Sequence, residues 1–173
     1  MKRTVFSLLA AFALCVSAAA AGPAVSCPSA LLMEKQTGTV LFAQDEHTPR
    51  EPASVTKIMT LLLVMEAIDS GVLSYDDVVT GSAHAAGMGG SQIWLKENEQ
   101  MTVEQLLNCM LIVSANEACN ILGETLYGSV DAFVARMNER AAELGCEHTH
   151  FANATGLHNS QHYTTAWDLY LIT

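Results

Sequence analysis

The sequence predicts a mixed α+β domain built around one buried helix. Two short β-prone runs near residue 30 favour a β-hairpin, and the middle of the chain carries helical periodicity and helix caps. Between these regions, residues 55–68 are apolar on nearly every side, which is typical of a helix buried within a domain. These three observations together predict helices packed around a central helix, with a smaller β component.

The first 21 residues have the pattern of a secretory signal peptide. Lys2 and Arg3 precede an apolar stretch that runs to about Ala13, and small residues follow at 18–21. The alternative is a retained membrane anchor, but the apolar stretch is shorter than the roughly 20 residues that a spanning helix needs. We therefore expect residues 1–21 to be removed and the rest of the chain to be exported.

Residues 22–173 have the length of one ordinary domain, and the 50% hydrophobic content of the chain allows a full core. The chain has 8 basic and 18 acidic residues. Removal of Lys2 and Arg3 leaves six basic residues, so the net charge becomes −12. Because nucleic acid and anionic lipid surfaces attract basic proteins, both are poor partners for this domain.

The β-prone runs are residues 30–34 and 39–42, and Gly38 lies in the reversal between them. This arrangement predicts a β-hairpin. A polar loop then leads to Ser54, where the buried helix begins, and Gly71 ends that helix. Residues 78–80 follow as a short predicted strand.

Two capping boxes mark the helical middle of the chain after a glycine-rich loop at residues 87–90. They pair Thr102 with Gln105 and Ser114 with Glu117. A third, amphipathic stretch is closed by a glycine at residue 145. The helices predicted in this region are 102–112, 114–126 and 130–144.

Thr165 can cap a last helix that begins at Ala166 and is still apolar when the sequence reaches Thr173. We therefore interpret the sequence as the N-terminal part of a longer protein.

Four cysteines remain after removal of the leader, and none forms a CxxC pair or a spacing typical of zinc ligands. Their spacing does not demand disulfide bonds. Two of them lie in apolar helical runs, where we expect buried free thiols. The four are Cys27, Cys109, Cys119 and Cys146.

Ser54 and Lys57 lie three residues apart at the start of the buried helix, so their side chains share one face. A serine hydroxyl becomes a strong nucleophile when a nearby base takes its proton, and a lysine can do this if its pKa is lowered. The positive N-terminus of the helix can also hold a developing oxyanion. The alternative is that Ser54 is only a helix cap.

Ser114-Ala115-Asn116 is a second candidate element between two predicted helices, although Ser114 can also serve as the cap described above. The pairing of S-x-x-K with a later S-x-N resembles the penicillin-binding protein and serine β-lactamase superfamily. Ala115 stands where the superfamily pattern has aspartate, a departure that the carboxypeptidases of the superfamily tolerate.

Residues 51–60, 88–92, 151–156 and 162–165 are similar to the serine-type D-alanyl-D-alanine carboxypeptidases, the low-molecular-mass penicillin-binding proteins of peptidase family S11. The resemblance covers residues 29–173. It implies a helical cluster packed on an antiparallel sheet, no cofactor, peptidoglycan stem pentapeptides as substrate and β-lactam antibiotics as inhibitors.

The resemblance also implies roles for individual residues. Ser54 would form the acyl-enzyme, and Lys57 would be the general base for acylation. Ser114 would relay protons toward the leaving group. Asn116 would hydrogen-bond Lys57 and the peptide backbone of the substrate.

Three alternatives to this function remain open. A class A β-lactamase would carry a glutamate in the region of residues 149–159, which contains no acid. An inactive fragment or binding module is possible because the family's Lys-Thr-Gly motif is absent and no lysine follows Lys96. A zinc site could use His158 and His162, but these lie in a predicted loop without an HExxH glutamate.

By the same resemblance, the remaining sheet strands, the Lys-Thr-Gly motif, a β-rich domain and an amphipathic membrane-anchoring helix would lie past Thr173. Membrane attachment would come only from that segment.

Overall fold

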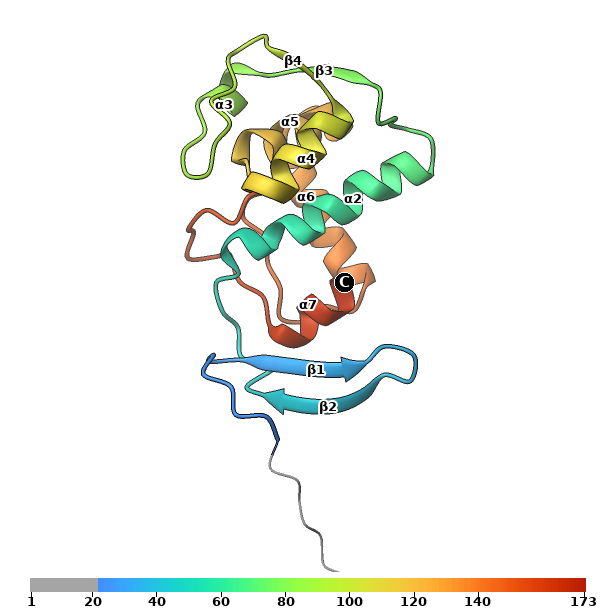
Figure 1. Cartoon of the computed structure of the whole chain (residues 1–173), viewed down its shortest axis with the longest axis vertical. Helices are drawn as coiled ribbons and strands as arrows, with labels where there is room; N and C mark the ends of the chain where they lie inside the picture. The colour runs from blue at the N-terminus through green and yellow to red at the C-terminus, as the bar shows by residue number, and fades with distance from the viewer. Residues whose placement is uncertain (1–21) are drawn as a thin grey trace, which may run out of the picture.

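The computed structural model describes residues 22–173 (Figure 1). The prediction of a leader at residues 1–21 therefore lies outside the described residues. Within the described part, no helix is long and apolar enough to span a membrane.

The predicted β-hairpin is present, with β1 (Ala30–Glu34) antiparallel to β2 (Thr39–Gln44). The second strand is two residues longer than predicted. Gly38 has φ +68°, a left-handed conformation that glycine adopts without strain, and it completes the reversal. In Figure 1 the hairpin lies at one end of the molecule, next to α7.

A short 3₁₀ turn, η1 (Ala53–Thr56), leads directly into α2 (Lys57–Asp69). Figure 1 shows α2 running through the middle of the molecule, where it contacts α5, α6 and α7. The prediction of a central helix is confirmed. One face of α2 is fully buried and the other faces are partly covered.

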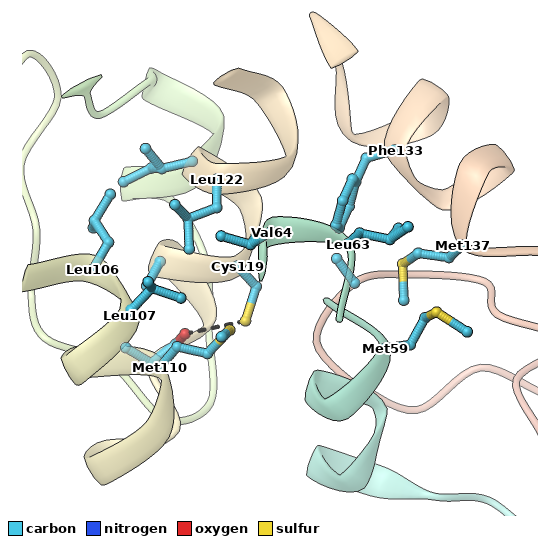
Figure 2. Close-up of a cluster of buried hydrophobic side chains, with 14 of the residues drawn as sticks. Met59, Leu63, Val64, Leu106, Leu107, Met110, Cys119, Leu122, Phe133 and Met137 are labelled. Atoms are coloured by element: carbon cyan, nitrogen blue, oxygen red, sulfur yellow. Dashed lines mark hydrogen bonds between the residues drawn. The ribbon is translucent and has the colours of Figure 1, made fainter. Parts of the chain in front are cut away.

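Three longer helices form the cluster against which α2 packs: α4 (Val103–Val113), α5 (Asn116–Tyr127) and α6 (Val130–Glu143). All three were predicted to within two residues at each end. Figure 2 shows Phe133 and Met137 of α6 facing Leu63 of α2 in the apolar core. A Cβ on Gly123 of α5 would lie 2.6 Å from the Phe133 ring, so this glycine permits the close approach of α5 and α6.

A second small sheet pairs the predicted strand β3 (Val78–Thr80) with β4 (Gln100–Thr102). Neither β4 nor the single-turn helix α3 (Ala83–Ala86) was predicted, because three or four residues are too few to show a periodicity. The capping box of Thr102 and Gln105 is confirmed at the start of α4.

The last helix, α7 (Ala166–Ile172), begins where predicted. Thr165 Oγ1 accepts a hydrogen bond of 3.0 Å from the Asp168 amide. The buried Asp168 carboxylate in turn accepts from the His148 amide and the Thr149 hydroxyl. These bonds fix the loop of residues 144–165 between α6 and α7.

The four cysteines of the described residues are all free thiols. Cys119 is fully buried, as expected, whereas Cys109 is only half-buried. Cys119 Sγ contacts the carbonyl of Ala115 at 3.4 Å (Figure 2).

Candidate active site

The fold places the Ser54 hydroxyl and the Lys57 amine beside each other at the junction of η1 and α2. Lys57 Nζ lies 3.4 Å from Ser54 Oγ. Ser54 is exposed, while Lys57 is only 6% exposed. The site therefore presents an accessible hydroxyl in front of a buried amine.

Two oxygen atoms accept hydrogen bonds from the Lys57 amine. They are Asn116 Oδ1, at 2.9 Å, and the backbone carbonyl of Thr155, at 2.8 Å. Burial lowers the pKa of Lys57, and the nearby Cys119 opposes this effect in part. A neutral amine has two N–H donors and one lone pair, so two acceptors leave the lone pair for Ser54 Oγ. This is the arrangement that a general base needs.

Ser114 lies in the tight turn between α4 and α5, with a left-handed backbone (φ 61°, ψ 32°). Its Oγ is buried and has no hydrogen-bond partner among the described residues. Ser114, Ser54 and Lys57 line one cavity of about 190 Å³, together with apolar side chains of α2 and α4. The structure thus brings together the three residues predicted to be catalytic.

The predicted capping box of Ser114 and Glu117 is wrong. Ser114 is the C-cap of α4, and Ala115, which has no side-chain cap bond, is the N-cap of α5. An N-cap serine needs an extended backbone to aim its oxygen at the helix amides, and the left-handed turn at Ser114 prevents this. The Glu117 carboxylate instead accepts from the backbone amides of Ile93 and Trp94, at 3.0 and 3.1 Å.

Asn116 connects the Lys57 amine to the glycine-rich loop of residues 87–90. Its Oδ1 holds Lys57, as the resemblance implied, while its Nδ2 donates to the Gly89 carbonyl at 2.6 Å. Its backbone amide donates to the Ser91 carbonyl. A Cβ on Gly90, which has φ +81°, would lie 2.8 Å from Asn116 Nδ2, so the loop can approach this closely only with glycine there.

The loop of residues 152–156 covers the same junction from the other side. Besides the Thr155 carbonyl at Lys57, the Ala154 carbonyl accepts from the Thr60 hydroxyl at 2.8 Å. A Cβ on Gly156, which has φ +85°, would lie 1.8 Å from the Ala53 carbonyl oxygen. Sequence reasoning did not assign a role to these backbone carbonyls, and the glycine at position 156 is the one residue type here from which a close approach could have been inferred.

His158 and His162, the pair considered as zinc ligands, have different partners. His158 is exposed and lies 3.0 Å from the Glu51 carboxylate. His162 is buried and contacts Thr56 Oγ1 at 2.7 Å. Within residues 22–173 no group of side chains has the arrangement of a metal site.

A larger, apolar cavity of about 460 Å³ lies between β1, α2 and α7. Val55, next to Ser54, lines it, but none of the polar side chains of the site does. The polar side chains of the candidate site therefore line the smaller cavity and not the larger one.

An exposed serine, a buried lysine three residues later and a second serine hydroxyl in the same cavity form the arrangement that serine acyl transfer with a lysine base requires. The protein-family model for D-alanyl-D-alanine carboxypeptidase, Peptidase_S11, matches residues 16–173. The chain belongs to this family.

Comparisons with individual proteins support the same family. The chain is 47% identical over 141 residues to D-alanyl-D-alanine carboxypeptidase DacF of Bacillus subtilis, covering 82% of this chain and 36% of that protein. It is 35% identical over 157 residues to DacD of Escherichia coli, covering 87% and 40%. The chain thus spans less than half the length of these relatives.

Solved structures have the same fold. The D-alanyl-D-alanine carboxypeptidase DacD from Francisella tularensis superimposes with a TM-score of 0.85 at 37% identity, covering 88% of this chain and 37% of that chain. Penicillin binding protein 6B from Escherichia coli gives 0.83 at 35% identity, covering 88% and 50%. The predicted penicillin-binding protein fold is confirmed for the part of it that this chain spans.

Proposed function

We propose that this chain carries the acylation machinery of a serine-type D-alanyl-D-alanine carboxypeptidase that acts on peptidoglycan stem pentapeptides. The observation that carries the proposal is the pairing of the exposed Ser54 hydroxyl with the Lys57 amine. Both N–H groups of the neutral amine have acceptors, and its lone pair is left for the serine proton.

In the proposed reaction, Lys57 takes the Ser54 proton as Oγ bonds to the carbonyl carbon of the penultimate D-alanine. The amide at the N-terminus of the helix stabilises the negative oxygen. The C–N bond to the terminal D-alanine then breaks, and Ser114 passes a proton to the departing amine. Water hydrolyses the ester, which frees Ser54 and the shortened peptide.

Asn116 has two parts in this scheme: it holds Lys57 through Oδ1, and it binds the backbone of the substrate. Its Nδ2 contacts the Gly89 carbonyl, so a substrate carbonyl would share or displace that bond. β-Lactam antibiotics would acylate Ser54 as substrate mimics. No cofactor takes part in these steps.

The domain organisation belongs to the same proposal. Residues 1–21 are a leader that directs export, and residues 22–173 are the N-terminal part of the catalytic domain. The longer relatives support the second part, because the chain covers only 36% of DacF and 40% of DacD. The protein would then work on the cell-wall side of the membrane.

The test uses protein expressed from the complete coding sequence, incubated with a fluorescent penicillin and analysed by intact mass and peptide mapping. We expect one covalent adduct on Ser54 and none in Ser54→Ala. Release of D-alanine from a stem pentapeptide should accompany slow loss of the adduct. An adduct on another residue would refute the assignment of Ser54.

A second candidate is penicillin binding without turnover, which the likeness to penicillin binding protein 6B supports. It predicts the Ser54 adduct without release of D-alanine. Rapid hydrolysis of nitrocefin would instead indicate a β-lactamase and contradict both candidates.

A further inference from the structure

His162 is a buried polar residue that the proposed reaction does not use. It is 3% exposed, and its ring packs edge-on against Phe151 with centroids 5.7 Å apart. Both ring nitrogens have hydrogen-bond partners. Nδ1 accepts from the Ala152 amide at 3.1 Å, and Nε2 lies 2.7 Å from Thr56 Oγ1.

These partners fix the protonation state of the ring. The Ala152 backbone N–H can only donate, so Nδ1 must be an acceptor and carry no proton. The single ring proton then lies on Nε2 and is donated to Thr56 Oγ1. His162 is therefore a neutral imidazole with one defined tautomer.

The two partners belong to the two segments that hold Lys57. Thr56 directly precedes Lys57 along the chain and is itself fully buried. Ala152 begins the loop whose Thr155 carbonyl accepts from the Lys57 amine. His162 thus joins the start of α2 to the loop that positions the amine.

We propose that His162 is a positioning residue, which keeps the Thr155 carbonyl on Lys57 and the Lys57 lone pair on Ser54 only while its imidazole is neutral. This inference deepens the proposed function and rests on it. A proton on Nδ1 would face the Ala152 N–H and place an unpaired charge in a buried site. Protonation would therefore separate the loop from α2.

The surroundings of the His162 ring favour its neutral form. Burial lowers the pKa of His162 below 6.5, His150 lowers it further, and Glu51 raises it. Lys57, next to Thr56 along the chain, is the titratable group at the start of α2. Because the folded pKa is lowered, the neutral ring's contribution is complete above pH 6.5 and is lost as pH falls through the folded value.

The first test is the pH profile of Ser54 acylation by a fluorescent penicillin, measured for the wild type and for His162→Asn. In the wild type we expect the logarithm of the rate to fall by one per pH unit as Lys57 gains its proton, and by two at pH values below the lowered folded pKa of His162, where the imidazole also gains one. His162→Asn should be about tenfold slower at neutral pH and keep a slope of one. The loss should fall on the acylation rate constant and not on the initial binding constant.

Two further variants distinguish a positioning role of His162 from a general loss of structure. Thr56→Val removes the acceptor of His162 and keeps the shape of the side chain, so Thr56→Val with His162→Asn should be no slower than either variant alone. His148→Asn changes an exposed histidine of the same loop region and should match the wild type. Additive losses, or a two-proton slope retained in His162→Asn, would overturn the proposal.

A second measurement does not depend on the reaction. The titration of Lys57, followed by NMR of its ε-carbon, should move toward the ordinary lysine pKa in His162→Asn, because water that enters between the loop and α2 relieves the burial that lowers this pKa. An unchanged Lys57 titration refutes the role of His162. Failure of Ser54 to react in the wild type refutes the proposed function instead.

Discussion

The two sides of helix α2 bury their atoms in different ways. In the middle of α2, side chains such as Leu63 pack in the apolar core with residues such as Phe133 of α6 (Figure 2). Around its first turn, Thr56, Lys57 and Thr60 are equally buried, yet each makes a directed hydrogen bond to a distant segment.

The apolar and polar contacts of α2 place different demands on their partners. Apolar contacts depend mainly on volume, and a core tolerates changes of shape at moderate cost. A buried polar atom depends on the position of one partner, and losing that partner leaves an uncompensated group. We therefore expect the apolar side to govern stability and the polar side to govern reactivity.

The largest expected effect is on reactivity and comes from Lys57→Met. Removing the base should slow Ser54 acylation by about 100- to 10,000-fold. Methionine has a similar length, but it leaves Asn116 Oδ1 and the Thr155 carbonyl without their donor, so the free energy of unfolding should fall by about 1–3 kcal/mol. The labelling rate and the unfolding curve of the same preparation provide the check. A large loss of stability would show that Lys57 is mainly structural.

The counterpart on the apolar side is Phe133→Ala, which removes a fully buried ring packed on Gly123. It should lower the free energy of unfolding by about 3–5 kcal/mol. The acylation rate per folded molecule should be unchanged, because the ring does not contact the site. A rate that falls in folded protein would contradict the separation of the two sides.

A smaller effect is expected from Glu117→Leu, at the border between the two sides. It leaves the Ile93 and Trp94 amides without their acceptor and should cost about 1–3 kcal/mol in unfolding free energy. Glu117→Gln is the matched control, since its amide oxygen can still accept both bonds. If both variants were equally destabilised, the charge and not the acceptor would be what holds the loop.

The contrast also explains what the sequence could predict. The central helix, the helical cluster and the hairpin follow from local periodicity, caps and Gly38, and they are present as predicted. The proximity of Ser54 and Lys57 follows from helical spacing. Their approach to Ser114 and Asn116 was implied only by family resemblance, since no local rule joins residues 60 positions apart.

The sequence could not predict other features of the site because backbone atoms form them. The Thr155 carbonyl at Lys57 has no side-chain signature, and any residue type supplies the same oxygen. The Ser114 and Glu117 pattern fits a capping box in the sequence, but the backbone at Ser114 is left-handed and Glu117 binds a loop some 23 residues earlier. A local pattern could not show that a distant segment competes for the carboxylate.

The contact between Lys57 and Thr155 joins residues 98 positions apart, and that between Thr56 and His162 joins residues 106 apart. Closing such long chain loops is entropically costly, so these bonds depend on a tertiary fold that holds both segments together. The serine is thus activated only in the completely assembled domain. Covalent labelling by a β-lactam would then count native molecules and serve as a chemical probe of folding.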